Sequence, residues 1–249
     1  RRGLLAGRRR ADAPRPAAQL RRERTEGIAY GVLAVLIWAG YLAFSRAGVL
    51  GNGLRPIDFA LFRFAPAGLV LLPVLWRYRA LGGLAGVPLA RVCVLTLFGG
   101  PLFITAATGG YLFAPLAHGA VLQPSMAVMT GLLLAVVLLH ETLRPAHWWG
   151  AAVICIGLVI CSSRGGSEAA HDAWLGDLLF LLAGALWAGF TAGVRKWRID
   201  PLRGTAAVSF VSLAVTLPAY LLWADTSRLA AMPGTALVSQ FVVQGVCAG

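Results

Sequence analysis

The sequence predicts an all-α polytopic membrane protein that contains two inverted five-helix repeats. The chain has 249 residues, of which 58% are hydrophobic and only 13% are charged, a balance too apolar for a water-soluble domain. The 49 residues between Arg91 and Glu141 contain no Asp, Glu, Lys or Arg. Because a spanning helix needs about 20 residues, this run is long enough for two helices joined by a short turn.

A third observation is an internal duplication. Gly27–Arg46 and Gly176–Arg195 share eight identities in twenty aligned positions. Each copy carries the same short motif, which reads Trp38-Ala39-Gly40-Tyr41 in the first and Trp187-Ala188-Gly189-Phe190 in the second. Prolines match as well, Pro56 and Pro73 with Pro201 and Pro218. Duplication within a membrane protein is typical of transporters.

Hydropathy then gives eight apolar segments in order along the chain. They are expected at Ile28–Ser45, Ile57–Trp76, Val92–Tyr111, Gly119–Leu139, His147–Cys161, Leu178–Val194, Thr205–Trp223 and Ala236–Gly249. The last segment is too short to span and stops within the pattern. By analogy with the first copy, about 60 further residues with two more helices are expected after it, for ten helices in all.

These segments divide the chain into four parts. Residues 1–26 are expected to form a basic, disordered cytoplasmic tail, residues 27–163 the first repeat, residues 164–174 a loop, and residues 175–249 the incomplete second repeat. Five helices per copy is an odd number, so the second copy starts on the opposite face of the membrane and is inverted. Inverted repeats give a structure two near-equivalent states, each open to one side, which is the basis of alternating access.

The basic residues predict the orientation in the membrane. With the N-terminus in the cytoplasm, the cytoplasmic segments contain 17 Lys and Arg residues and the outer loops contain four, as the positive-inside rule requires. The formal net charge of +12 therefore fits a tail and loops that meet anionic headgroups of the lipid bilayer. Nucleic-acid binding is not expected.

Arg63 is the strongly charged residue that falls inside a predicted span, seven residues after Pro56. Charges within a membrane tend to be functional, so Arg63 is a candidate anchor for a substrate carboxylate or phosphate, or one half of a gating ion pair. The alternative is structural, with the side chain snorkelling to the outer interface helped by nearby Asp58. The sequence leaves both interpretations open.

Three further residues are candidates for helix capping or proton coupling. Glu141 ends the fourth segment shortly before the next helix starts at Pro145, so its carboxylate is expected to accept hydrogen bonds from the free amides of that helix. His118 and His140 add titratable rings. Coupling of transport to protons through these groups is the alternative interpretation.

Interrupted helices indicate where a solute site would lie. Gly99-Gly100-Pro101 interrupts the third segment, and Gln123-Pro124 is expected to interrupt the fourth in the same way. Broken helices with free carbonyls build the midplane sites of transporters, although Gly and Pro are also common in ordinary spanning helices. Trp38 and Trp187 lie at mid-span, where their rings either face each other across the axis between the copies or pack against helices and lipid. The candidates for solute contact are Trp38, Tyr111, Gln123 and Trp187, with Arg63 as the charge.

Catalytic and metal-binding motifs are absent from the sequence. It contains no Walker A, His-Glu-x-x-His or Gly-x-Ser-x-Gly motif and no acidic metal cluster, so neither an enzyme nor ATP-driven transport is favoured. Cys93, Cys155, Cys161 and Cys247 fall in apolar segments without Cys-x-x-Cys spacing. No cofactor, metal site or disulfide framework is therefore expected.

Several of these segments together resemble the drug/metabolite transporter superfamily, specifically the EamA-type permeases. Leu36–Tyr41 is similar to the first-helix signature of that family, and Phe62-Arg63-Phe64 to the Arg-Phe pair of its second helix. Leu122–Leu143 resembles the fourth helix, except that His140 replaces the usual Gly before the Glu, and Gly150–Gly157 resembles the fifth. The resemblance implies ten helices in two inverted repeats, a central cavity, and movement of amino acids, metabolites or drugs without ATP, by proton coupling or solute exchange.

The sequence therefore favours a secondary transporter of the bacterial inner membrane that exports a small metabolite, amino acid or drug, with the proton as a candidate coupling ion. Whether the protein forms a homodimer is left open. Two rival functions remain. A relative that flips a lipid-linked group needs a basic groove open to the lipid, and a polytopic membrane enzyme needs polar side chains clustered at one interface.

Overall fold

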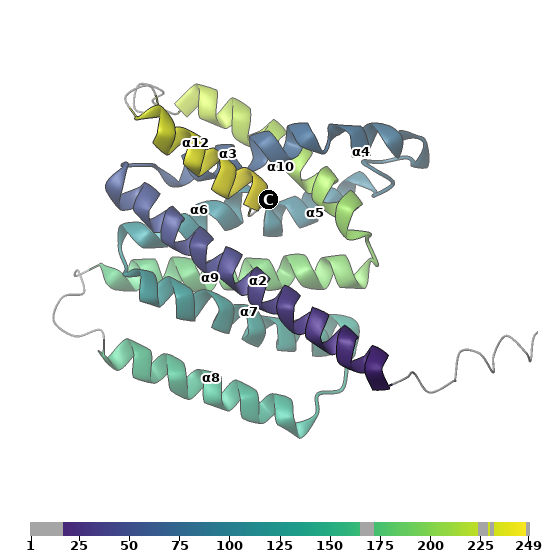
Figure 1. The fold of residues 1–249 in the computed structure, drawn as a ribbon, viewed down its shortest axis with the longest axis vertical. Coiled ribbons are helices and arrows are strands. Elements are labelled where there is room, and N and C mark those ends of the chain that lie inside the picture. The colour runs from purple at the N-terminus through teal and green to yellow at the C-terminus, as the bar shows by residue number, and fades with distance from the viewer. Residues whose placement is uncertain (1–16, 165–171, 224–228, 230–231, 248–249) are drawn as a thin grey trace, which may run out of the picture. The chain divides into compact units, whose positions relative to one another are not determined.

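Every regular element in the part of the chain that the structure describes is a helix (Figure 1). The computed structural model describes residues 17–164, 172–223, 229 and 232–247. The longer helices are α2 (Ala17–Gly51), α3 (Pro56–Val70), α5 (Leu89–Gly99), α6 (Pro101–Gly109), α7 (Leu116–Leu139), α8 (Pro145–Arg164), α9 (Ala173–Lys196), α10 (Pro201–Trp223) and α12 (Gly234–Val242). The short elements are α4 (Leu72–Arg77), the 3-10 turns η1 (Arg79–Leu81) and η2 (Gly110–Leu112), and the π-helical turn η3 (Val243–Cys247).

The chain divides into two compact units, Arg1–Gly40 and Tyr41–Gly249. What the structure describes of the first unit is the N-terminal part of α2. The prediction of a disordered tail at residues 1–26 is wrong for residues 17–26, because α2 already begins at Ala17. The rest of that predicted tail lies outside the described residues.

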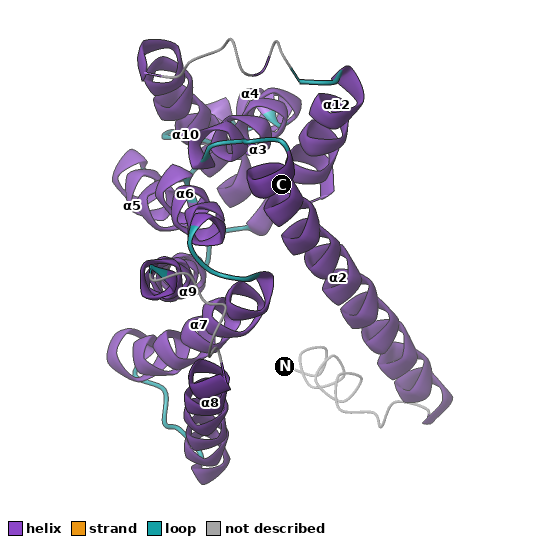
Figure 2. Ribbon diagram, turned by 90° about the vertical axis from the view of Figure 1, so that its left-hand side faces the viewer, coloured by secondary structure: helices purple, strands orange, loops and turns teal. Residues whose placement is uncertain are grey.

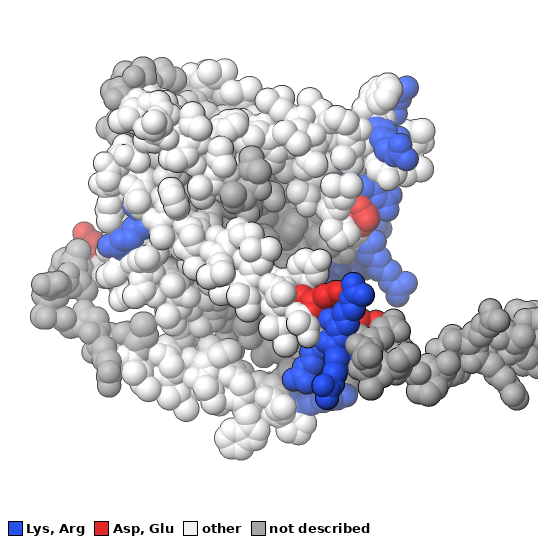
Figure 3. Space-filling view, in the orientation of Figure 1, with Lys and Arg blue, Asp and Glu red and all other residues white. Residues whose placement is uncertain are grey.

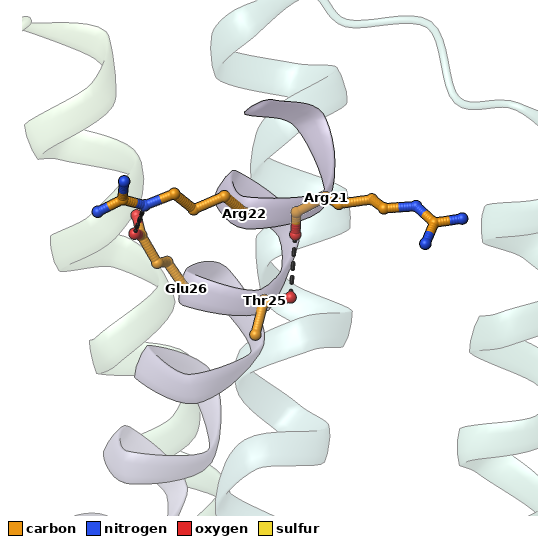
Figure 4. Close-up of polar contacts among 4 residues, drawn as sticks. All are labelled: Arg21, Arg22, Thr25 and Glu26. Carbon is orange, nitrogen blue, oxygen red and sulfur yellow. Dashed lines mark hydrogen bonds and ion pairs between the residues drawn. The ribbon is translucent and has the colours of Figure 1, made fainter. Parts of the chain in front are cut away.

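Two local contacts help to explain the early start of α2 (Figure 4). Arg22 Nε donates a hydrogen bond to Glu26 Oε1 at 2.8 Å, and Thr25 Oγ1 donates one to the backbone carbonyl of Arg21 at 2.9 Å. Both join residues four apart, which lie on the same face of a helix. A charged segment of good helix formers can therefore continue the apolar helix that follows it.

Five helices among the described residues are long and apolar enough to cross a membrane. They comprise Arg21–Gly51, Leu89–Leu112, Leu116–Leu139, Ala173–Lys196 and Pro201–Leu222. The second predicted segment divides at Leu71 into α3 and α4, and α8 contributes a shorter apolar stretch. Large apolar side chains face outward on these helices, among them Trp149 at 75% exposure, which suits a lipid environment.

Proline affects two helices of the second unit differently. The break predicted at Gly99-Gly100-Pro101 is confirmed, because α5 ends at Gly99, Gly100 leaves helical geometry (φ −96°, ψ −145°), and α6 begins at Pro101. The interruption predicted at Gln123-Pro124 is wrong, because α7 runs unbroken from Leu116 to Leu139 with Pro124 inside it. A proline removes only one helical hydrogen bond, and packing against a neighbouring helix can hold the rest.

The neighbour that packs along α7 is α9, and Figure 2 shows the two side by side. A Cβ atom added at Gly184 of α9 would collide with the backbone carbonyl of Gln123, so glycine permits direct contact between the two helix backbones. Gly176 permits a similar approach to the backbone at Gly110. Small residues at helix crossings are how membrane helices gain close packing without a hydrophobic drive between them.

The helix ends of the second unit separate by charge. Three contacts show that the helix ends on one side lie close together. Arg195 pairs with Glu141 at 2.6 Å. Arg91 lies 5.7 Å from the centroid of the Trp197 ring, and Arg203 lies 5.6 Å from that of Tyr78. Figure 3 shows Lys and Arg side chains along the right-hand edge, where these ends of the second unit lie. This basic end comprises Arg77, Arg79, Arg91, Arg144, Arg195, Lys196, Arg198 and Arg203, whereas Arg46 and Arg55 lie at opposite helix ends.

Candidate functional site

A cavity of about 150 Å³ lies between α3, α5, α9 and α10 of the second unit. Its lining combines one charge, three aromatic rings, and small or hydroxyl-bearing side chains. The lining residues are Arg63, Phe64 and Ala67 from α3, Gly99 from α5, Trp187 and Phe190 from α9, and Thr205, Val208 and Ser209 from α10. No Asp or Glu is among these residues of the described structure. The sequence candidates Arg63 and Trp187 therefore meet in one cavity.

Arg63 supplies the charge of this cavity. Its guanidinium carbon lies 5.9 Å from the centroid of the Tyr41 ring, a cation–π contact from α2. Within the described residues, no carboxylate forms an ion pair with Arg63. The expected assistance from Asp58 is not present, because Asp58 Oδ2 accepts a hydrogen bond from the backbone N–H of Arg55 at 2.7 Å. Asp58 thus caps the start of its own helix.

Aromatic rings form one wall beside the charge. The Trp187 ring lies 5.4 Å from Phe190, centroid to centroid, and 5.3 Å from Phe103 of α6. A Cβ atom at Gly99 would lie 2.6 Å from the Phe190 ring, so glycine lets this ring lie against the end of α5. The wall therefore presents flat apolar faces next to a guanidinium.

The break between α5 and α6 lies beside the cavity. Gly99 is both the last residue of α5 and a lining residue. A Cβ atom built on Gly100 would lie 2.9 Å from Ser212 Oγ and 3.0 Å from the Thr96 side chain. The hydroxyl oxygens of Thr96 and Ser212 are buried and have no hydrogen-bond partner in the described structure. Such orphaned oxygens are uncommon in proteins, so polar groups concentrate here in an otherwise apolar region.

The fourth residue of each repeated motif reaches Arg63 or its cavity. Tyr41 stacks on the guanidinium, and Phe190 belongs to the lining. Sequence reasoning selected the tryptophans instead, although the same alignment pairs Tyr41 with Phe190. Trp38 lies in the first unit, so its pairing with Trp187 across an axis stays a prediction.

Other lining residues gave no usable signal in the sequence. Phe64, Thr205 and Ser209 are ordinary residues of spanning helices, and nothing in the sequence shows which face of each helix turns inward. Val208 had a weak signal, because it aligns with Arg63 between the two copies. This alignment with a charged residue is the one feature of the sequence that points to Val208.

Tyr111 and Gln123 do not line this cavity. Tyr111, in η2, is 2% exposed and packs with its ring centroid 5.0 Å from that of Phe180. Gln123 is 7% exposed within the contact between α7 and α9, and its Oε1 has no partner in the described residues. The structure places both in packed regions, and a role in solute contact stays a prediction.

His118 pairs with a residue that the sequence reasoning missed. Its Nδ1 lies 2.7 Å from Oδ1 of Asp177, and the side chains are 12% and 26% exposed. The pair joins the first turn of α7 to the beginning of α9, at the ends opposite the basic end. Asp177 was overlooked because the sixth predicted segment starts one residue later, although a carboxylate so close to an apolar run was a usable signal.

His140 and Glu141 lie directly after the last residue of α7. His140 adopts the left-handed conformation (φ 53°) that closes the helix, and the backbone N–H of Glu141 donates to the carbonyl of Ala135 at 3.0 Å. This is the position at which helices favour glycine, which explains the Gly usual in similar sequences. The Glu141 carboxylate pairs with Arg195 at 2.6 Å, and His147 Nδ1 accepts the backbone N–H of Arg144 at 3.0 Å. Capping of α8 by Glu141 stays a prediction.

The comparison with known proteins identifies the family of this chain. Residues 25–163 match the family model described as the EamA-like transporter family, and they make up more than half of the chain. No curated protein and no solved structure matches the chain. The chain is thus a multi-pass membrane protein that belongs to the EamA-like transporter family, within the drug/metabolite transporter superfamily.

Proposed function

We propose that this protein is a secondary transporter that moves a small solute across the bacterial inner membrane by alternating access, and that the cavity at Arg63 holds the solute. The observation that carries the proposal is the cavity itself. It places a charge without a carboxylate partner among the described residues between helices of both predicted repeats. Charges inside membranes are costly and are retained where they meet a substrate or an ion.

Matched features of the two halves support an inverted repeat. The turn η3, Val243–Cys247, leaves α-helical geometry at the positions that align with the break around Gly99. A Cβ atom at Gly245 would collide with Pro66 of α3, whereas one at Gly100 would press on Ser212 of α10. Each irregular helix therefore packs on the second helix of the other copy. Crossings of this kind are expected around an axis that runs between α3 and α10.

The same arrangement supports an orientation. The basic end of the second unit corresponds to the cytoplasmic loops under the positive-inside rule, and the His118–Asp177 end then faces outward. We propose His118–Asp177 as the proton-coupling pair if transport uses protons. The pair joins two helices, and both of its side chains are partly exposed. We assign no coupling role to His140, which closes α7, or to Glu141, which pairs with Arg195 at the basic end.

A chemically blocked cavity tests the proposed function. The variant Thr205→Cys places a thiol of similar size at a lining position that is partly exposed, so a reagent can reach it in the folded protein. After reconstitution of the intact protein into liposomes, treatment with a bulky thiol reagent is expected to abolish uptake of a metabolite pool. The same treatment of Val215→Cys, at an exposed position of the same helix, is expected to leave uptake unchanged.

Two controls complete this test. The parent protein receives the same reagent, because Cys93 and Cys155 are free and exposed. Liposomes without protein give the background, and reversing the orientation of the solute gradient reports the direction of transport. Uptake that persists in fully modified Thr205→Cys protein would mean that the cavity is not the solute site.

A further inference from the structure

We infer that the solute of this cavity is a small organic anion, a monocarboxylate attached to a flat apolar group. This inference rests on the proposed function and specifies its substrate class. Three properties of the described lining lead to it: the sign and number of charges, the geometry around the guanidinium, and the size and shape of the apolar wall.

The charges favour an anion with one negative group. Arg63 is the one charged residue in the lining, and no Asp or Glu accompanies it there. A cationic solute would meet a like charge in a poorly solvated cavity, where repulsion is strong. A zwitterion would bring an ammonium group for which this lining supplies no carboxylate. A phosphate dianion would need more than a single guanidinium to offset its desolvation.

The geometry leaves the guanidinium able to bind a carboxylate edge-on. The Arg63 guanidinium lies over the Tyr41 ring, a contact that restricts its motion without forming an ion pair. A planar guanidinium offers paired donors that match the two oxygens of a carboxylate. Thr205 and Ser209 in the lining provide hydroxyl donors for the same group.

The apolar wall suits a flat group of limited size. Trp187 and Phe190 line the cavity with ring planes 29° apart, and this aromatic surface suits contact with a planar substituent. A cavity of about 150 Å³ is comparable to an apolar cavity that admits one benzene molecule. A carboxylate at Arg63 and a ring against Trp187 together describe a solute of the size of benzoate.

Equilibrium binding to the intact protein in lipid nanodiscs tests this inference without leakage of the solute through a membrane. Tritiated benzoate is the probe at pH 7.5, with unlabelled benzoate, benzamide, benzylammonium, phenylalanine and inorganic phosphate as competitors. We expect benzoate to compete best and benzamide, which has the same shape without the charge, to compete at least about 10-fold less well.

The variant Arg63→Gln is expected to weaken benzoate binding by about 10- to 100-fold, the range for loss of a charge-assisted hydrogen bond. Arg63→Lys, which keeps the charge but not the paired donors, is expected to fall between the two. Arg79→Gln is the matched control, because Arg79 also stacks on an aromatic ring, 4.6 Å from the Trp76 centroid, but lies at the exposed basic end. It should bind benzoate as the parent does.

The outcomes separate the two proposals. If the parent protein binds no benzoate, or if phenylalanine, benzylammonium or phosphate competes better than benzoate, the substrate class is wrong. Because this series uses the unmodified protein, it stays decisive even if Arg63→Gln fails to fold. The proposed function is decided separately, by whether blocking Thr205→Cys stops uptake of the metabolite pool.

Discussion

The cavity at Arg63 and the contact around Gln123 show how similar sequence signals lead to opposite structures. Both regions combine a polar side chain with a nearby proline in an apolar helix. At Pro101 the preceding Gly100 leaves helical geometry, the helix divides, and an open space remains next to Arg63. At Pro124 the helix continues, and Gly184 of the neighbouring helix packs directly on the backbone of Gln123.

A proline in an apolar helix therefore indicates a site only when the neighbouring helix leaves room for one. Backbone carbonyls freed by proline can be covered by packing as well as by a solute. The residue before the proline also matters, because glycine reaches conformations that other residues avoid. Four substitutions test this contrast between the two regions.

Gly184→Val tests whether α7 and α9 are closely packed at Gln123. The added side chain would collide with the backbone at Gln123, and we expect a loss of about 3 kcal/mol of stability or more, seen as loss of monodisperse protein and a lower melting temperature. Gly131→Val is the control, because a Cβ atom at Gly131 meets no atom within 4 Å. Equal melting temperatures for the two variants would mean that the contact is loose.

Asp177→Asn tests the polar pair at the end of the same contact that lies opposite the basic end. The amide oxygen of Asn can still accept a hydrogen bond from the ring but without the negative charge, so we expect a loss of about 1–1.5 kcal/mol. A double-mutant cycle with His118→Gln, read by thermal unfolding, isolates the coupling between the two side chains. Additive effects would show that the pair contributes no coupling energy. Transport that keeps its pH dependence in Asp177→Asn would exclude the pair as the proton-coupling site.

Gln123→Leu tests whether that side chain belongs to the solute path. The Oε1 atom is buried without a partner in the described structure, so an apolar side chain of similar volume is expected to leave stability unchanged or raise it by about 1 kcal/mol. Uptake by reconstituted protein should stay at the parental level. A large fall in uptake with normal folding would move Gln123 into the pathway and remove the contrast with Arg63.

His140→Gly tests the end of α7. Relief of the left-handed conformation gains about 1–2 kcal/mol, and the greater freedom of glycine in the unfolded chain costs about 0.5–1 kcal/mol, which leaves a small net gain in stability. Melting temperature measures the gain, and His140→Ala, which keeps the strain, is the control. If uptake loses its pH dependence in His140→Gly, then the histidine has a coupling role that its position at the helix end does not suggest.

The features that depend on amino-acid composition were the easiest to predict from the sequence. The low charge density and the apolar runs predicted the helical membrane protein, and the family signatures around Leu36–Tyr41 and Leu122–Leu143 agree with the family match over residues 25–163. The break at Gly100 was also predictable, because Gly-Gly-Pro offers neither helix propensity nor a full set of donors.

The sequence alone could not decide which faces of the helices meet. Membrane helices are apolar on nearly every side, since lipid and protein core are both apolar, so no stripe of hydrophobic residues marks the inward face. The placement of Phe190, Thr205 and Ser209 at Arg63 therefore came only from tertiary packing, as did the partner of His118. Composition determined that this chain forms membrane helices and where one of them breaks. Packing decided which break borders a cavity and which proline lies in a closed contact, because that depends on the side chains of a different helix.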